Sequence, residues 1–309
     1  MDISFQQLKY VLELVEHRHF GQAANACHVT QPTLSMQIRK LEDGLGQELF
    51  RRDRSPLELT PFGAAILPEL YELRDQYHQL DQRVLEAQGA GHGELRIGVI
   101  PTIAAYLVPG LFEQQDQLDR RYHWKITELK SEELLEALEK RQLDLGIMAG
   151  PVSGGSLHKT PLFNEEILVY APELKGKRVS LQELQTLQPW LLSKGNCLRT
   201  QMIHFCDLQR EGEQRWTYEG GNLEMLLRLV DRHGGYTLVP EFYKTEYDLS
   251  KKHLKRVYDH SKSVHPARHI LALSPSRSGE SQAIQDVLSY IKRKYTFSQS
   301  GDFELLSWR

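Results

Sequence analysis

The sequence predicts an all-α winged module at the N-terminus, then one long helix, and then a two-lobe α/β domain. Three observations predict this order. Residues 20–50 show the spacing of two short amphipathic helices, and residues 62–88 carry apolar residues at spacings of three and four. From residue 94 onward, β-branched runs alternate with helical patterns, which is typical of parallel βαβ units.

The first pattern, in residues 20–50, predicts a helix-turn-helix. Apolar residues from Leu34 to Leu41 repeat at spacings of four and three, and Thr30 is a suitable N-cap. Pro32 fits a first helical turn, whose amides have no intrahelical partner. The second helix would present short polar side chains at its N-terminal end, which suits a DNA major groove, although such a face can also simply be solvated. The predicted DNA-contacting residues of this motif are Thr30, Gln31, Pro32, Thr33, Ser35 and Arg39.

Residues 49–60 predict a short hairpin beside that helix, with Arg51, Arg52 and Arg54 exposed. Arg51 and Arg54 are expected to contact phosphates while the helix contacts base edges. The first 60 residues hold seven lysines and arginines against eight aspartates and glutamates, so only this arginine cluster is basic. We therefore expect modest DNA affinity per monomer and a need for two or more DNA-binding units on one site.

Residues 62–88 predict a long helix. Its apolar residues follow a near-heptad rhythm on an otherwise charged helix, which favours a coiled-coil seam with a partner chain. The alternative is a helix packed against its own domain. Pro68 removes one backbone hydrogen bond near the start, and residues 87–93, AQGAGHG, predict a flexible hinge.

The region after the hinge predicts two α/β lobes joined by strands near residues 165 and 268. Lobe I would comprise about 94–164 and 269–295, and lobe II about 165–268. Strands are expected at 94–100, 124–129, 143–150, 166–172, 189–194, 215–220, 235–240 and 268–274, with helices through 106–112, 134–138, 197–208, 222–232 and 279–294.

Three polar residues fall at positions where such folds bind small ligands. Thr102 and Ser131 follow the first two strands, and Asn222 opens a helix in the other lobe. Ligands of open α/β sheets bind beyond the carboxyl ends of strands, at helix N-termini. Singly, each residue is explained as a helix cap; together they predict a site in the interlobe cleft.

Two cysteines lie nine positions apart in GNCLRTQMIHFCDLQ. If residues 197–208 are helical, Cys197 and Cys206 lie on opposite faces, with a rise of about 13 Å between them. A disulfide needs Cα atoms within roughly 7 Å, so bonding them would require this segment to unwind, as in a conformational switch. Cys197, at the helix N-terminus beside Arg199, is the more reactive candidate. The alternative is that both cysteines are inert packing residues.

The whole chain resembles the LysR-type transcriptional regulators, most strongly in AANACHVTQPTLSMQIRKLEDGLGQELFRR. Within that family it is most similar to the peroxide-responsive activators, through EHRHF, QIRKLED, IGVIPT and the two spaced cysteines. The resemblance implies a winged helix-turn-helix DNA-binding domain at 1–61, a dimerisation helix at 62–88, and a periplasmic-binding-protein-like regulatory domain at 94–309. The implied partners are double-stranded promoter DNA, further copies of the chain as a dimer or tetramer, and RNA polymerase.

The resemblance also implies roles for particular residues. Cys197 matches the cysteine that reacts with peroxide, and Cys206 matches the resolving cysteine. The predicted peroxide or ligand contacts are Thr102, Ser131, Asn196, Arg199, Thr200 and Arg268. Ser131 stands where the family usually has a threonine. Two departures matter more: Asn196 replaces a histidine and Thr200 an aspartate, and losing an imidazole and a carboxylate alters thiolate stabilisation and proton delivery.

Other classes of protein are disfavoured. The chain has no apolar run near the ~20 residues that span a bilayer and no export signal, so we expect a cytoplasmic protein. Its histidines show no ligand spacing, so no metal or cofactor is expected. The absence of Cys-x-x-Cys and the DNA-binding module argue against a thiol enzyme or solute-binding protein. The remaining alternative is a LysR-type regulator that binds a small anionic metabolite between the lobes, with incidental cysteines.

Overall fold

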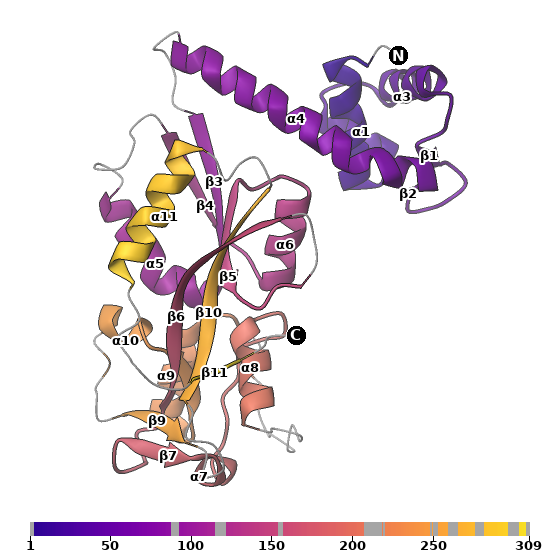
Figure 1. Ribbon diagram of the computed structural model, residues 1–309. Coiled ribbons are helices and arrows are strands. Elements are labelled where there is room, and N and C mark those ends of the chain that lie inside the picture. Colours follow the sequence, from indigo (N-terminus) through magenta and orange to yellow (C-terminus); the bar gives the residue numbers. More distant parts are fainter. Residues whose placement is uncertain are drawn as a thin grey trace. The chain divides into compact units, whose positions relative to one another are not determined.

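The computed structural model describes residues 3–87, 93–114, 122–153, 157–206, 218, 220–247, 249, 253–258, 265–275, 281–295 and 303–306. The chain divides into two units, residues 1–91 and 92–309 (Figure 1). Most of the expected hinge at 87–93 and of the expected strand at 215–220 lies outside the described residues.

The first unit contains the predicted helix-turn-helix and wing. Its elements are α1 (Phe5–His17), α2 (Phe20–Ala26), α3 (Gln31–Leu45), the antiparallel pair β1 (Phe50–Arg51) and β2 (Glu58–Leu59), and α4 (Pro61–Ala87). The sequence reading did not include α1, which starts with a capping box in which Ser4 and Gln7 satisfy each other's backbone amides. The core of this unit lies between α1, α2 and α3.

The turn between α2 and α3 is set by three neighbouring residues. His28 adopts a left-handed conformation with φ of 56°, and Val29 N donates to Ala24 O at 3.0 Å. Thr30 then caps α3 by accepting a hydrogen bond from the Thr33 amide at 3.4 Å. This confirms the predicted N-cap, which fixes where the first turn of α3 begins.

The long helix α4 continues past Pro68 to Ala87. Near its start, Leu70 and Tyr71 are buried in the core of the first unit. Further along, an apolar stripe stays exposed, at 43–58% of each side chain: Leu73, Tyr77, Leu80 and Val84. The near-heptad spacing therefore corresponds to an apolar stripe that is exposed among the described residues.

The second unit is built on a mixed sheet of order β4-β3-β5-β10-β6-β9-β7, with β11 paired to β10 and β8 paired to β6. The strands are β3 (Gly93–Val99), β4 (Tyr122–Glu128), β5 (Leu145–Ala149), β6 (His158–Tyr170), β7 (Arg178–Ser180), β8 (Thr237–Pro240), β9 (Leu254–Tyr258), β10 (His265–Ser274) and β11 (Phe303–Leu305). β3 runs parallel to β4 and β5, as βαβ units require, whereas β10 is antiparallel to β5 and β6. Of the expected strand at 189–194, the structure has only a bridge between Pro189 and Tyr236.

The helices of this unit are α5 (Pro101–Gln114), α6 (Ser131–Glu139), α7 (Leu181–Gln185), α8 (Cys197–Phe205), α9 (Leu223–His233), α10 (Tyr243–Glu246) and α11 (Gln282–Lys294). In Figure 1, α5 and α11 lie on one side of the β3–β5 strands and α6 on the other. The long strands β6 and β10 run from this lobe into the other and pair with each other, while the expected lobe boundaries near residues 165 and 268 stay a prediction. β7, β9, β11, α7 and α10 were not expected.

Candidate functional site

A cluster of four buried side chains lies where three helices begin beside the long strands. Thr102 is the second residue of α5, and Ser131 and Cys197 are the first residues of α6 and α8. Arg268 comes from β10. All four side chains are buried, with at most 2% exposed. The structure thus brings together four of the predicted site residues.

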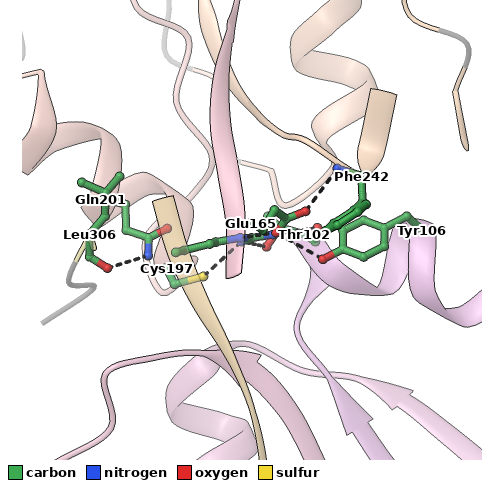
Figure 2. Close-up of polar contacts among 8 residues, drawn as sticks. Thr102, Tyr106, Glu165, Cys197, Gln201, Phe242 and Leu306 are labelled. Carbon is green, nitrogen blue, oxygen red and sulfur yellow. Dashed lines mark hydrogen bonds and ion pairs between the residues drawn. The ribbon is translucent and has the colours of Figure 1, made fainter. Parts of the chain in front are cut away.

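The Arg268 guanidinium connects this group. Its Nη1 donates to Thr102 Oγ1 at 2.8 Å and lies 4.0 Å from Cys197 Sγ (Figure 2). Its Nη2 donates to the Thr102 carbonyl at 3.2 Å. A fixed cation and several helix N-termini therefore surround one sulfur atom, an arrangement that stabilises negative charge.

Glu165, which the sequence reading missed, orients Arg268. Its Oε2 accepts from Arg268 Nε at 2.7 Å and from the Tyr106 hydroxyl at 3.2 Å, and its Oε1 accepts from Phe242 N at 3.4 Å. Burial raises the pKa of Glu165 and Arg268 opposes the rise. Because arginine stays protonated in proteins, we treat the two as an ion pair. The signal in the sequence is a glutamate directly before the expected apolar strand at 166–172, since a carboxylate buried there needs a cation.

Burial also raises the pKa of the Cys197 thiol. The charge of Arg268 and hydrogen bonds from Thr102 and Ser131 oppose this rise, but burial dominates. The Ser131 hydroxyl has no nitrogen or oxygen partner in the described part of the chain. Burial thus disfavours the thiolate of Cys197, while the surrounding groups favour it.

Arg199, which the sequence places beside this sulfur, has a different hydrogen-bond partner. Its Nη1 donates to the Leu192 carbonyl at 3.0 Å, while the guanidinium beside Cys197 is that of Arg268. Asn196 caps α8 without a side-chain cap bond, and its Nδ2 donates to Ser193 O and Oγ at 3.0 and 3.1 Å. Thr200 is half-buried. These three residues flank the Cys197 group, and their contact with a ligand stays a prediction.

Cys206 lies at the other end of the cysteine helix. The expected helix through 208 ends at Phe205, and residues 207 and 208 are outside the described residues. Cys206 is buried, and burial raises its pKa to about 11 despite a hydrogen bond with the Tyr236 hydroxyl. Both cysteines are free thiols, kept apart by the intact α8 at a rise of about 13 Å.

The same helix contacts the C-terminal strand through Gln201. Its Nε2 donates to the Leu306 carbonyl at 3.1 Å, and the residue is fully buried (Figure 2). The amide of Leu306 in turn donates to Ala267 O at 2.8 Å, next to Arg268 on β10. The cysteine helix and the strand pair β10–β11 are therefore linked.

The predicted DNA-contacting residues lie on the surface of the first unit. Thr30, Gln31, Pro32, Arg39, Arg51 and Arg54 are exposed, and Thr33 and Ser35 are half-buried. Arg52 differs from the expectation of an exposed wing arginine: it forms an ion pair with Glu42 and lies over the Phe20 ring, 5.6 Å from its centroid.

Glu42, on α3, is a second residue that the sequence reading missed. Its Oε1 accepts hydrogen bonds from Leu49 N at 2.8 Å and Phe50 N at 3.3 Å, while Oε2 contacts Arg52. Gly63 lets α4 approach the same segment, since a Cβ there would lie 2.3 Å from the Leu49 carbonyl oxygen. The wing is thereby held at a fixed position relative to α3.

Comparison with family models decides the class. A model described as "Bacterial regulatory helix-turn-helix protein, lysR family" matches residues 5–64, and one described as "LysR substrate binding domain" matches residues 88–296. The chain belongs to the LysR family. It is a LysR-type transcriptional regulator with an N-terminal helix-turn-helix domain and a two-lobe regulatory domain, which confirms the expected fold class.

Several curated relatives are peroxide regulators. The chain is 32% identical to the hydrogen peroxide-inducible genes activator of Dickeya chrysanthemi over 242 residues, 77% of this chain and 79% of the relative. It is 31% identical to the DNA-binding transcriptional dual regulator OxyR of Escherichia coli K12, over 77% and 79% of the two chains. A match of 29% to the HTH-type transcriptional regulator EstR of Acinetobacter baylyi covers 95% of this chain and 97% of EstR.

Solved structures agree on the fold. A cysteine variant of full-length OxyR from Pseudomonas aeruginosa has a TM-score of 0.69 at 25% identity, covering 94% and 95% of the two chains. A hydrogen-peroxide-bound OxyR variant of Corynebacterium glutamicum has a TM-score of 0.57 at 26% identity, covering 95% and 92%. These relatives are transcription regulators, and regulators of this family bind promoter DNA and oligomerise. None of the helices in the described residues is long and apolar enough to cross a membrane.

Proposed function

We propose that this regulator senses hydrogen peroxide through Cys197 and transmits the signal to promoter DNA. The observation that carries the proposal is the position of Cys197 Sγ, buried beside Arg268 and the hydroxyls of Thr102 and Ser131. The peroxide-responsive relatives support the same inducer.

The first chemical step oxidises Cys197. Its sulfur attacks one peroxide oxygen, the O–O bond breaks, and the departing hydroxide takes the thiol proton, so that a sulfenic acid and water form. Negative charge develops on the departing oxygen, and Arg268 with the adjoining helix N-termini stabilises it. Ser131, whose hydroxyl has no nitrogen or oxygen partner in the described part of the chain, is placed to transfer the proton.

The second step requires a change in the fold. The Cys206 sulfur attacks the sulfenic sulfur, the S–S bond forms, and the hydroxyl leaves as water with the Cys206 proton. Because α8 separates the two residues, the helix must unwind before they meet. Burial of Cys206 beside Tyr236 keeps it protonated until that happens.

The output proceeds through the assembly. The exposed stripe of α4, Leu73, Tyr77, Leu80 and Val84, supports pairing with a second copy. Refolding around α8 changes how subunits meet, and with it the spacing of paired α3 helices on the promoter. RNA polymerase is then the partner that responds to the altered complex.

Peptide mapping of the full-length protein tests the chemistry. Reduced protein treated with peroxide is expected to give a crosslinked pair of peptides containing Cys197 and Cys206. A Cys197→Ser variant should give none, whereas Cys27→Ser, which alters a buried cysteine of the first unit, should behave like the wild type. Failure to detect the crosslink in the wild type would contradict the proposal.

A second function is a regulator induced by a small anionic metabolite, with the cysteines incidental. Two observations favour it: EstR, which matches 95% of this chain, is not named for peroxide, and Asn196 Oδ1 is buried without a partner among the described residues. Reporter transcription separates the two functions, because Cys197→Ser would then leave induction intact.

A further inference from the structure

Met36 is an exposed apolar side chain on α3. It is 60% exposed, whereas its neighbours Leu34 and Ile38 are fully buried. At 100° per residue, Met36 lies about 160° around the helix from each of them. It therefore occupies the middle of the face opposite the core and contributes nothing to the packing of the first unit.

The surroundings of Met36 combine positive charge with a shallow hollow. The groove beside it is lined by Pro32, Ser35, Met36, Arg39, Lys40 and Asp43. Arg39 and Lys40 are exposed cations, and Asp43, also exposed, lies about one turn further toward the C-terminal end of the helix. The exposed face near the middle of α3 thus carries an apolar tip beside two cations, which attract a polyanion.

We propose that Met36 is a specificity-determining residue that contacts the C5-methyl group of one thymine in each half-site. Base edges in the major groove offer donors and acceptors, and the thymine methyl is their one apolar group. The other predicted contact residues of α3, such as Gln31 and Ser35, are hydrogen-bonding groups, so the thioether adds a kind of contact that they lack. Its unbranched, flexible chain can adjust to the methyl position. The inference rests on the proposed insertion of α3 into the major groove.

Replacing thymine by uracil tests this contact, because the exchange removes the methyl group alone. Full-length reduced protein selects a duplex from a random pool, and each thymine of one half-site is then replaced by uracil in turn. At one position we expect wild-type affinity to fall about four-fold, the value for one buried methyl group. Met36→Ala should bind the thymine and uracil duplexes equally, at about the wild-type affinity for the uracil duplex.

Two further measurements show whether the effect belongs to Met36 and to a base contact rather than to a phosphate contact. Met225→Ala, the same substitution at an exposed methionine of the second unit, should retain the full uracil effect. The slope of log affinity against log salt should be unchanged in Met36→Ala, because no phosphate contact is lost, and shallower in Arg39→Ala. An unchanged unfolding midpoint of Met36→Ala establishes that the variant is folded.

The outcomes separate the inference from the function on which it rests. If the wild type selects and binds a duplex but every uracil replacement affects it and Met36→Ala alike, Met36 does not contact a methyl group and the inference is wrong. If the wild type binds no duplex from the pool, DNA binding through α3 is wrong as well. If Met36→Ala instead changes the oligomeric state at equal DNA affinity, the face binds another copy of the chain and the inference is also overturned.

Discussion

Arg268 and Glu165 face each other in the register of β10 and β6 and form a fully buried ion pair, with Nε and Oε2 2.7 Å apart. Glu165 also accepts from Tyr106 on α5 and from the amide of Phe242. The pair therefore joins the long strands to both lobes and at the same time aims the guanidinium at Thr102 and Cys197. One arginine therefore serves both the stability of the domain and the proposed sensing chemistry.

Glu165→Gln should destabilise the protein by about 3 kcal/mol, because it leaves the buried Arg268 charge without a counter-ion. Urea unfolding measures the change. Glu224→Gln is the matched control: its partner Arg228 and Glu224 itself are 70% and 44% exposed, so its effect should stay below about 0.5 kcal/mol. Equal midpoints for the two variants would contradict the importance of the buried pair.

Cys206 should make stability fall as the pH rises from 9 to 11. Its pKa is about 11 in the folded protein against 9.0 in the unfolded chain. Above pH 9 the unfolded state loses this proton first, so the stabilisation that is complete below pH 9 is lost as the pH approaches 11. The contribution of this thiol changes by about 1.4 kcal/mol per pH unit in that window.

Other groups titrate in the same range, so the difference between wild type and Cys206→Ala is the quantity to measure. Denaturant unfolding of the reduced proteins at several pH values gives it. We expect the difference to decline between pH 9 and 11 and to be constant below pH 8. A constant difference throughout would show that Cys206 is not held as a buried thiol.

Glu42→Ala should weaken DNA binding, although Glu42 is not itself one of the predicted DNA-contacting residues. The substitution leaves the amides of Leu49 and Phe50 and the Arg52 guanidinium without their shared acceptor. We expect a loss of about 2 kcal/mol in stability. The affinity for DNA should also fall, because Arg51 and Arg54 are no longer held beside α3. Glu42→Gln keeps one acceptor oxygen. Its free energy of unfolding in urea and its affinity for duplex DNA should therefore lie between those of the wild type and Glu42→Ala.

Local patterns in the sequence were sufficient for the helix-turn-helix, the wing and most strands. Leu34 and Ile38 repeat with the helical period, and Thr30 caps the helix that they predict. The helix α1 was missed although its capping box is local, whereas two other missed features depend on partners far along the chain. Glu165 is paired with a residue 103 positions away, and β11 exists only as a neighbour of β10.

The positive charge beside Cys197 also comes from a residue far away in the sequence. Proximity in sequence pointed to Arg199, but that side chain donates to the Leu192 carbonyl. The guanidinium beside the sulfur is that of Arg268, which comes from β10. The resemblance to known regulators identified Arg268, whereas spacing alone did not. Arg52 likewise was expected to be exposed on the wing, but it forms an ion pair with Glu42 and lies over the Phe20 ring.

Oxidation should release the C-terminal strand if α8 unwinds as proposed. Gln201 lies in the middle of that helix, and its amide is the side-chain donor to Leu306. Unwinding α8 removes this hydrogen bond and leaves β11 held by its pairing with β10. Amide hydrogen exchange at residues 303–306 should therefore become faster in peroxide-treated wild type and stay slow in treated Cys197→Ser.

A variant of the reduced protein isolates the contact itself. Gln201→Leu keeps the volume but removes the donor, so it should cost about 1–3 kcal/mol and speed exchange in β11 without peroxide. Gln185→Leu, on the exposed surface of α7, serves as the control and should leave β11 protected. The crosslink could form while exchange at β11 stays the same in reduced and oxidised wild type. That outcome would mean that the centre of α8 does not unwind, and that the disulfide forms by rearrangement at the two ends of α8.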